Sequence, residues 1–183
     1  YRFVAFLKLV FPKIDVRITN NLNRQEDLIK GFDFDVLVVI GGGILKTQII
    51  NAANECTITI HNSRLPRLRG WGGGEIWAMI HGDISALGQS IFYTDTSIDG
   101  GDIVLQETCP ITPNDTLDEI ILRNTLIGAG LLAKSLALFR GGIFPRTPQD
   151  DIQATYIRGG PSPAEFESGM KNLERWKAAV NDS

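Results

Sequence analysis

Hydrophobic residues recur along this chain with two different periods, which divide it into predicted strands and helices. Period-two alternation and short hydrophobic runs predict strands at 14–18, 35–40, 56–61, 88–93 and 103–108. Hydrophobic residues three and four positions apart predict helices at 1–11, 24–30, 44–50, 75–81, 116–140 and 166–180. Strands that alternate with helices are typical of an α/β domain, so we expect one sheet flanked by helices.

Two local patterns sharpen this prediction. The run 35–40 is almost entirely hydrophobic and β-branched, as expected of a strand buried on both faces of a parallel sheet. The glycines at 41–43 predict a tight turn, but GxGxxG and its acidic partner are absent, which argues against a dinucleotide site. Thr116 and Glu119 have the spacing of a capping box, so the longest helix begins there and ends at the glycines 141–142.

The strand 56–61 carries the first candidate for catalysis. Thr57, Thr59 and His61 alternate with isoleucines, which places the three polar side chains on one face of the strand. Ligands of open α/β sheets bind outside the carboxyl ends of the strands, so His61 is a candidate catalytic residue. The alternative is a histidine that caps the strand and bonds to loop carbonyls.

Charged residues in two loops suggest further candidates. Arg64, Arg67 and Arg69 follow His61 and could hold an anionic substrate, or could simply be solvated. Asp95, Asp99 and Asp102 lack the spacing of a calcium loop and its closing glutamate. We therefore expect a turn at these aspartates and no metal.

Composition narrows the class of protein. A chain of 183 residues with 43% hydrophobic residues can bury one sizeable core, and we expect a domain at 1–145 with an extension at 146–183. The net charge of −3 disfavours nucleic acid as a partner. The two cysteines predict reduced thiols and a cytoplasmic protein. No hydrophobic run approaches the roughly 18 residues of a membrane span, and the start does not resemble a signal peptide.

Two segments together resemble the 10-formyltetrahydrofolate-dependent formyltransferase family. Its hallmark, Asn-x-His-x-Ser-x-x-Pro-x-x-x-Gly, matches His61, Ser63, Pro66 and Gly70, and its later Leu/Ile-Asp-x-Gly segment matches 98–101. The similarity extends over roughly 35–142. It implies a Rossmann-like, open, mostly parallel sheet flanked by helices. The chain opens on what corresponds to the helix after the family's first strand, so we expect that strand to be lacking.

The resemblance also implies an activity and its residues. It implies an enzyme that transfers a formyl group from 10-formyltetrahydrofolate to an amine of a small molecule such as an amino sugar. His61 and Asp99 correspond to the catalytic pair, and Thr59 stands where the family has asparagine. The remaining residues that it implies are Gly42, Gly43, Ile44, Leu45, Asp95 and Ser97 for the donor, and Ser63, Arg64 and Arg67 for the substrate.

Several alternatives stay open. Water in place of the amine would make the protein a formyltetrahydrofolate hydrolase, and carbamoyl could replace formyl. Because Thr59 replaces asparagine, a weakened homologue that binds folate or a partner is a further alternative. The family's tRNA-directed members carry a basic C-terminal domain, whereas this chain is acidic and stops at Ser183, so we expect a small-molecule amine rather than initiator tRNA. A homodimer is compatible with the sequence.

Overall fold

The computed structural model describes residues 21–181. The helix predicted at 1–11 and the strand predicted at 14–18 lie outside these residues. Several helical elements of the described chain are short: η1 (Leu22–Arg24), α2 (Glu26–Lys30), α3 (Thr47–Ile50), η2 (Ile84–Ala86) and η3 (Asp151–Gln153).

A four-stranded sheet forms the centre of the described chain. It comprises β1 (Val36–Ile40), β2 (Cys56–His61), β4 (Gly88–Tyr93) and β5 (Ile103–Thr108), in the order β1-β2-β4-β5. β1 and β2 are parallel, and β4 is antiparallel to both of its neighbours. Three of the four strands therefore run in one direction, which confirms the predicted mostly parallel sheet, with β4 as its reversed member.

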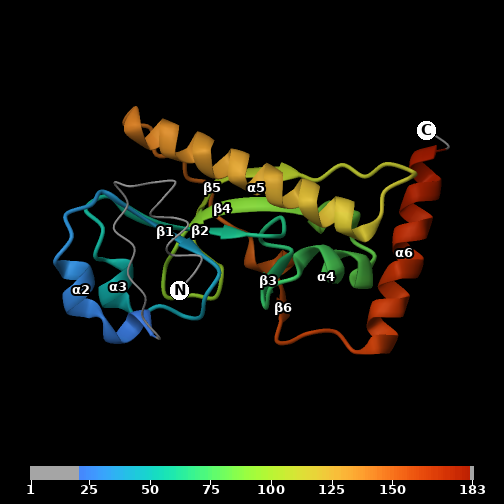
Figure 1. Ribbon diagram of the computed structural model, residues 1–183, viewed down its shortest axis with the longest axis horizontal. Helices are drawn as coiled ribbons and strands as arrows, with labels where there is room; N and C mark the ends of the chain where they lie inside the picture. Colours follow the sequence, from blue (N-terminus) through green and yellow to red (C-terminus); the bar gives the residue numbers. More distant parts are fainter. Residues whose placement is uncertain (1–20, 182–183) are drawn as a thin grey trace, which may run out of the picture.

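The long helix α5 (Leu117–Arg140) covers one face of this sheet (Figure 1). It begins as predicted, because the Glu119 amide donates to Thr116 Oγ1 at 3.3 Å and the Thr116 amide donates to the Glu119 carboxylate at 2.8 Å. Ile120, Leu131 and Phe139 are buried on its inner side. Within residues 21–181, α5 is the one helix long and apolar enough to cross a membrane, a test that core helices of soluble proteins also pass.

A second, two-stranded sheet adjoins the first. β3 (Leu68–Gly70) pairs in parallel with β6 (Thr155–Ile157), and Gly70 has a φ of +97°. A Cβ at Gly70 would collide with the Ile157 carbonyl oxygen, so this close pairing requires glycine.

Beside this small sheet, α6 (Pro163–Asn181) lies against α4 (Gly74–His81) at one end of the molecule (Figure 1). Asn172 of α6 donates to the Met79 carbonyl oxygen at 2.8 Å, and Leu173 is buried with Met79 in one cluster. The domain boundary predicted at residue 145 stays a prediction.

Two predictions about residues 35–50 were wrong. The helix predicted at 44–50 begins only at Thr47, because the Asn23 side chain accepts from the Lys46 amide at 2.7 Å and donates to the Ile44 carbonyl oxygen at 2.9 Å. These bonds keep Ile44–Lys46 out of the helix. β1 is only partly buried, and Ile40 is 72% exposed, because β1 is the last strand of the described sheet.

Candidate active site

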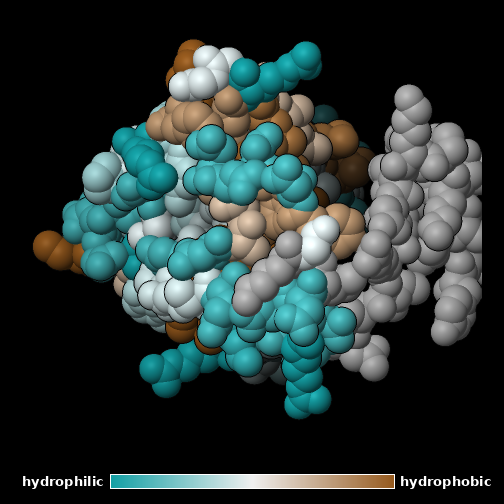
Figure 2. Space-filling model, turned by 90° about the vertical axis from the view of Figure 1, so that its left-hand side faces the viewer, coloured by the Kyte–Doolittle hydropathy of each residue, from teal (hydrophilic) through white to brown (hydrophobic). Residues whose placement is uncertain are grey.

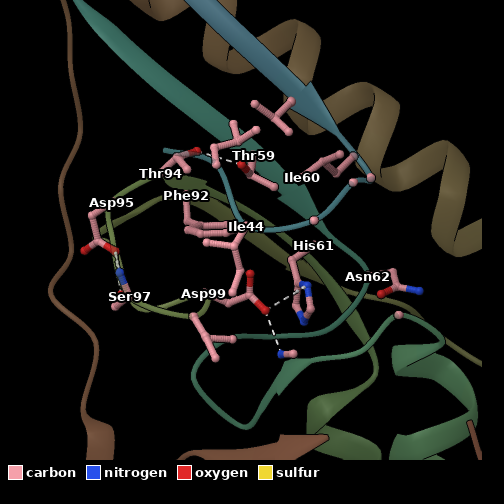
Figure 3. A pocket seen from close by; sticks show the side chains of 18 of the residues that line it. Ile44, Thr59, Ile60, His61, Asn62, Phe92, Thr94, Asp95, Ser97 and Asp99 are labelled. Carbon is pink, nitrogen blue, oxygen red and sulfur yellow. Dashed lines mark hydrogen bonds and ion pairs between the residues drawn. The ribbon is translucent and has the colours of Figure 1, made fainter. Parts of the chain in front are cut away.

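A pocket of about 650 Å³ lies where β1 and β2 end and where the loop after β4 crosses them (Figure 3). Its volume is in the range of small-molecule sites. Nine of the twelve predicted site residues line it: Thr59, His61, Asp99, Gly42, Gly43, Ile44, Leu45, Asp95 and Ser97. Segments separated by some fifty residues in the sequence therefore meet in one cavity.

His61, the last residue of β2, is only 8% exposed. Its Nε2 lies 2.9 Å from the Leu68 carbonyl oxygen, and because a carbonyl only accepts, Nε2 carries the hydrogen. The neutral ring then leaves Nδ1 unprotonated, 3.8 Å from Asp99 Oδ2. Burial lowers the pKa of His61 below 6.5, although the Asp99 carboxylate and the Leu68 bond oppose this. The proton-accepting form therefore prevails near neutral pH. The bond to the Leu68 carbonyl oxygen is the one expected of a strand-capping histidine, and the catalytic role of His61 stays a prediction.

Asp99 is fixed by its backbone neighbours as well as by its position beside His61. It has a φ of +50°, in the left-handed region that non-glycine residues rarely adopt. Its Oδ2 accepts the Gly70 amide at 2.7 Å (Figure 3). The carboxylate therefore connects the start of the Trp71–Gly73 turn to the ring of His61.

Gln149 and Arg69 hold the loop that carries Asp99. The Gln149 carboxamide nitrogen donates to the Asp99 and Gly101 carbonyl oxygens at 3.0 and 2.6 Å. Its oxygen accepts from Arg69 Nη2 at 2.8 Å, and Arg69 is only 2% exposed. The sequence analysis gave Gln149 no role in the site, because a glutamine in a polar loop carries no periodic signal.

Thr59 lies on β2 two residues before His61, and its hydroxyl is 2.6 Å from the hydroxyl of Thr94. Either hydroxyl can donate. The pair has two hydroxyl hydrogens and uses one in this bond, so one remains for a ligand.

The side-chain amide of Asn62, the residue after His61, bonds to a residue outside β2. Its Nδ2 donates to Glu75 at 3.0 Å, and in Figure 3 its side chain points away from His61. Burial raises the pKa of Glu75, while the hydrogen bonds from Asn124 and Asn62 lower it. Asn62 therefore cannot take the place of an amide at position 59.

Loop 41–46 forms another wall of the pocket. Gly41 and Gly42 have φ values of +65° and +118°, which side chains with a Cβ rarely adopt. The following Ile44 is 76% exposed and lines the pocket, and the Asn23 bonds described above fix the backbone beside it. An apolar side chain and backbone groups therefore face the cavity together.

The loop after β4 supplies the opposite wall. The Ser97 amide donates to the Asp95 carboxylate at 2.8 Å, which closes a turn between them. Ile98, which is 47% exposed, and the ring of Phe92 also line the cavity. Sequence reasoning did not name Phe92, Thr94 or Ile98 as candidates, although all three lie in or beside the segment that carries Asp99.

The three predicted substrate residues do not line the pocket. Ser63 is buried and donates to the Leu68 carbonyl oxygen at 2.7 Å. Arg64 donates to the Ser85 carbonyl oxygen at 3.3 Å, and Arg67 forms an ion pair with Asp83 at 2.9 Å. The structure thus gives these side chains partners within the chain, and a role in substrate binding finds no support in the geometry.

Gln89 is a further pocket residue that the sequence did not suggest. Its side chain is 3% exposed, and its Oε1 is buried without a hydrogen-bond partner among residues 21–181. Buried carbonyl oxygens usually have a partner, so Gln89 is a candidate ligand contact. In the part of the chain that the structure describes, no three histidine, cysteine, aspartate or glutamate side chains could hold a metal ion.

Comparison with known proteins identifies the family. The family model described as formyl transferase matches residues 13–132, which is more than half of the chain. The chain belongs to the formyl transferase family. The match includes Thr59, His61 and Asp99, so the resemblance seen in the sequence is confirmed.

Relatives in this family extend well beyond the present sequence. The chain is 34% identical over 156 residues to a methionyl-tRNA formyltransferase of Syntrophus aciditrophicus, covering 85% of the chain and 47% of the relative. It is 39% identical over 111 residues to a cytosolic 10-formyltetrahydrofolate dehydrogenase of Pongo abelii, covering 60% of the chain and 12% of the relative. The chain therefore spans about half, or less, of these relatives.

Solved structures of formyl transferases share the fold. The formyltransferase PseJ of Anoxybacillus kamchatkensis, solved with a formamido sugar nucleotide and tetrahydrofolate, superposes with a TM-score of 0.67 at 22% identity, covering 86% of this chain and 80% of that one. A 4-N formyltransferase of Francisella tularensis gives the same TM-score at 16% identity, covering 93% of this chain and 72% of that one. The α/β fold expected of a formyl transferase is confirmed.

Proposed function

We propose that this protein transfers a formyl group from 10-formyltetrahydrofolate to the amine of a small molecule such as an amino sugar. One observation carries the proposal: the unprotonated Nδ1 of His61 lies 3.8 Å from the Asp99 carboxylate in a pocket large enough for a small molecule. Such a pair suits proton transfer, because the carboxylate stabilises the imidazolium that forms.

His61 moves the proton in the proposed reaction. The amine nitrogen bonds to the formyl carbon, the bond from that carbon to N10 of the folate breaks, and one amine proton must reach N10. Nδ1 of His61 accepts this proton and returns it to N10, while Nε2 stays bound to the Leu68 carbonyl oxygen. Asp99, held by the Gly70 amide, faces the protonated ring.

The hydroxyl pair Thr59–Thr94 supplies the oxyanion donor. Negative charge develops on the formyl oxygen during attack, and a donor aimed at that oxygen lowers the barrier by about 3 kcal/mol. The pair has one free hydroxyl hydrogen for this bond. An asparagine at position 59 would offer two amide hydrogens, so the present site is expected to react more slowly.

The donor fits the two walls beside this pair. Ile44, Ile98 and Phe92 offer apolar surface for a flat ring, and the backbone of the glycine turn is open to polar ring atoms. The solved relative PseJ was crystallised with tetrahydrofolate, and a Helicobacter canadensis relative with folinic acid, which supports the same ligand class here.

The acceptor is proposed to be a small amine. The net charge of −3 gives no electrostatic attraction to tRNA, and the chain shares its fold with enzymes solved with amino-sugar nucleotides. The chain is proposed to act in the cytoplasm, where its two free cysteines stay reduced.

Calorimetric titration with 5-formyltetrahydrofolate, a stable analogue of the donor, tests the proposal first. Wild type should bind, and Asp99→Ala should weaken binding by distorting the 95–99 loop. Formyl transfer is then measured as tetrahydrofolate release with a panel of amino sugars and with initiator tRNA. A folded chain that binds no folate, or that formylates only tRNA, would contradict the proposal.

Hydrolysis is the second candidate, since the pocket that would hold the amine is large enough to admit water. Water that attacks the formyl carbon in place of the amine would release formate and tetrahydrofolate. Formate production that is independent of added amine would support the hydrolase, whereas formate that disappears as amine is added supports the transferase.

A further inference from the structure

The outward side of α5 carries a continuous stripe of exposed residues. They are spaced by three, four or seven positions, which places them on one face of the helix. This stripe consists of Asp118, Leu122, Ala129, Ala133, Leu136 and Arg140, all of them exposed. Leu122 is 60% exposed and Leu136 is 37% exposed, so the stripe exposes large apolar side chains as well as charges.

The charged and leucine positions of the stripe are symmetric about Ala129. Asp118 and Arg140 each lie eleven positions from Ala129, and Leu122 and Leu136 each lie seven positions from it. If two copies of α5 crossed in antiparallel orientation at Ala129, Asp118 of one copy would meet Arg140 of the other. Leu122 of one copy would meet Leu136 of the other, so these four positions of the stripe are complementary to themselves in charge and in hydrophobicity.

The geometry of α5 permits such a crossing. Ala129 and Ala133 are small, which lets two helix axes approach to the 8–10 Å of packed helices. The 24 residues of α5 span about 36 Å, and its C-terminal end extends past the strands of the sheet (Figure 1). Figure 2 shows the molecule from the side on which α5 ends, where hydrophobic residues gather toward the top.

The two charges of the stripe point to a protein partner rather than a lipid. Asp118 and Arg140 take part in none of the ion pairs among residues 21–181, so each is available to a partner. We infer that a second copy of this chain packs against this stripe, with the two α5 helices antiparallel and Ala129 at the twofold axis. Isologous twofold contacts of this kind are the commonest symmetry of homo-oligomers.

Sedimentation velocity over a concentration series tests the interface. Wild type should show a reversible monomer–dimer equilibrium. Leu122→Lys places a charge opposite Leu136 and should weaken dimerisation at least about tenfold. Ile152→Lys is the matched control, because Ile152 is 94% exposed and lies outside α5. Circular dichroism checks that each variant is folded.

Two further variants test the orientation. Asp118→Arg should weaken the dimer, and adding Arg140→Asp should restore it, since the ion pair returns with its signs exchanged. Ala129→Cys should form a disulfide-linked dimer under mild oxidation, whereas Lys134→Cys, exposed but off the stripe, should not exceed the wild-type background.

Three outcomes would overturn the inference. A wild-type chain that stays monomeric at every soluble concentration has no such dimer. A dimer that survives Leu122→Lys uses another surface, and a chain that remains monomeric but floats with anionic phospholipid vesicles uses the stripe for lipid. Failure of the charge exchange together with failure of the Ala129→Cys cross-link would exclude the antiparallel register.

Discussion

Gln149 donates a hydrogen bond of 3.0 Å to the carbonyl oxygen of Asp99, fifty positions earlier in the sequence. The same carboxamide accepts from the buried Arg69, whose strand β3 also provides the Gly70 amide for the Asp99 carboxylate. The backbone and the side chain of Asp99 are thus fixed from two separate segments.

Gln149→Ala should therefore reduce the rate of formyl transfer, although the Gln149 side chain acts only through the loop that carries Asp99. Releasing the loop lets the Asp99 carboxylate move away from His61, and a displacement of about 1 Å can cost on the order of 100-fold in rate. We expect kcat to fall about 10- to 100-fold with little change in KM. Gln153→Ala, which alters only an exposed bond to Asp150, is the matched control, and an equal loss there would contradict this role.

The rate should depend on pH through His61. In the proposed reaction the unprotonated Nδ1 accepts the proton, and burial holds the pKa of His61 below 6.5, so the rate should rise with pH with its midpoint below 6.5. Asp99→Asn removes the carboxylate that raises this pKa. The rise of the rate should therefore move to lower pH, while the maximal rate falls about 100-fold. Profiles of kcat/KM measure both effects. A rise that moves to higher pH in Asp99→Asn would contradict the proposed pairing of His61 with Asp99.

Thr59→Asn should increase turnover. The longer amide offers two hydrogens where the Thr59–Thr94 pair offers one, so we expect a gain of about tenfold or more in kcat. Binding of 5-formyltetrahydrofolate should change little, which separates the effect on the transition state from donor affinity. Lower turnover in a folded variant would indicate that the hydroxyl pair serves a different reaction.

Asn23→Ala should weaken donor binding. Asn23 bonds to the backbone of Ile44 and Lys46, and without it loop 41–46 loses its fixed shape. The dissociation constant for 5-formyltetrahydrofolate should increase about tenfold, the effect of losing roughly 1.4 kcal/mol of preorganisation. Asn54→Ala, which removes an exposed bond to Asp33, is the control and should bind like wild type.

Arg123 should stabilise the start of α5 in a pH-dependent way. Arg123 donates two bonds of 2.6 Å to Asp115, a residue only 5% exposed, and these bonds hold the pKa of Asp115 well below 3.8. Arg123→Ala should destabilise the protein by about 2 kcal/mol at neutral pH.

The stabilisation by Arg123 should be lost on acidification, because a depressed carboxylate pKa stabilises the folded state only while the carboxylate is ionised. Melting temperatures of wild type and variant should therefore converge as the pH falls below 3.8. Arg175→Ala, at an exposed bond to Asn172, should melt like wild type throughout.

Sequence predicted the elements whose signals are local. The capping box at Thr116 and Glu119 located the start of α5, and alternation located β2 and β4 to the residue. It missed β3, which has three residues and exists only by pairing with β6, more than eighty residues later. It extended α3 to Ile44, because the Asn23 side chain that prevents helix there is a tertiary contact.

The candidate site was predicted unevenly for the same reason. Periodicity placed Thr59 and His61 on one face, but nothing local connects His61 to Asp99, and that pairing came from the family resemblance. The role of Gln149 could not be inferred, since it depends on where β3 and β6 meet. Arg64 and Arg67 were selected for their charge, and the structure gives both of them partners within the chain.

The β3–β6 pairing also sets an order of events during synthesis. The segment 155–157, which pairs with Leu68–Gly70, and Gln149, which holds the Asp99 loop, lie near the end of this sequence. A nascent chain emerging from the ribosome already contains His61 and Asp99 long before either of these partners exists. The proposed catalytic pair can therefore take its final geometry only when residues up to about 157 have emerged, and shorter translation products would lack it.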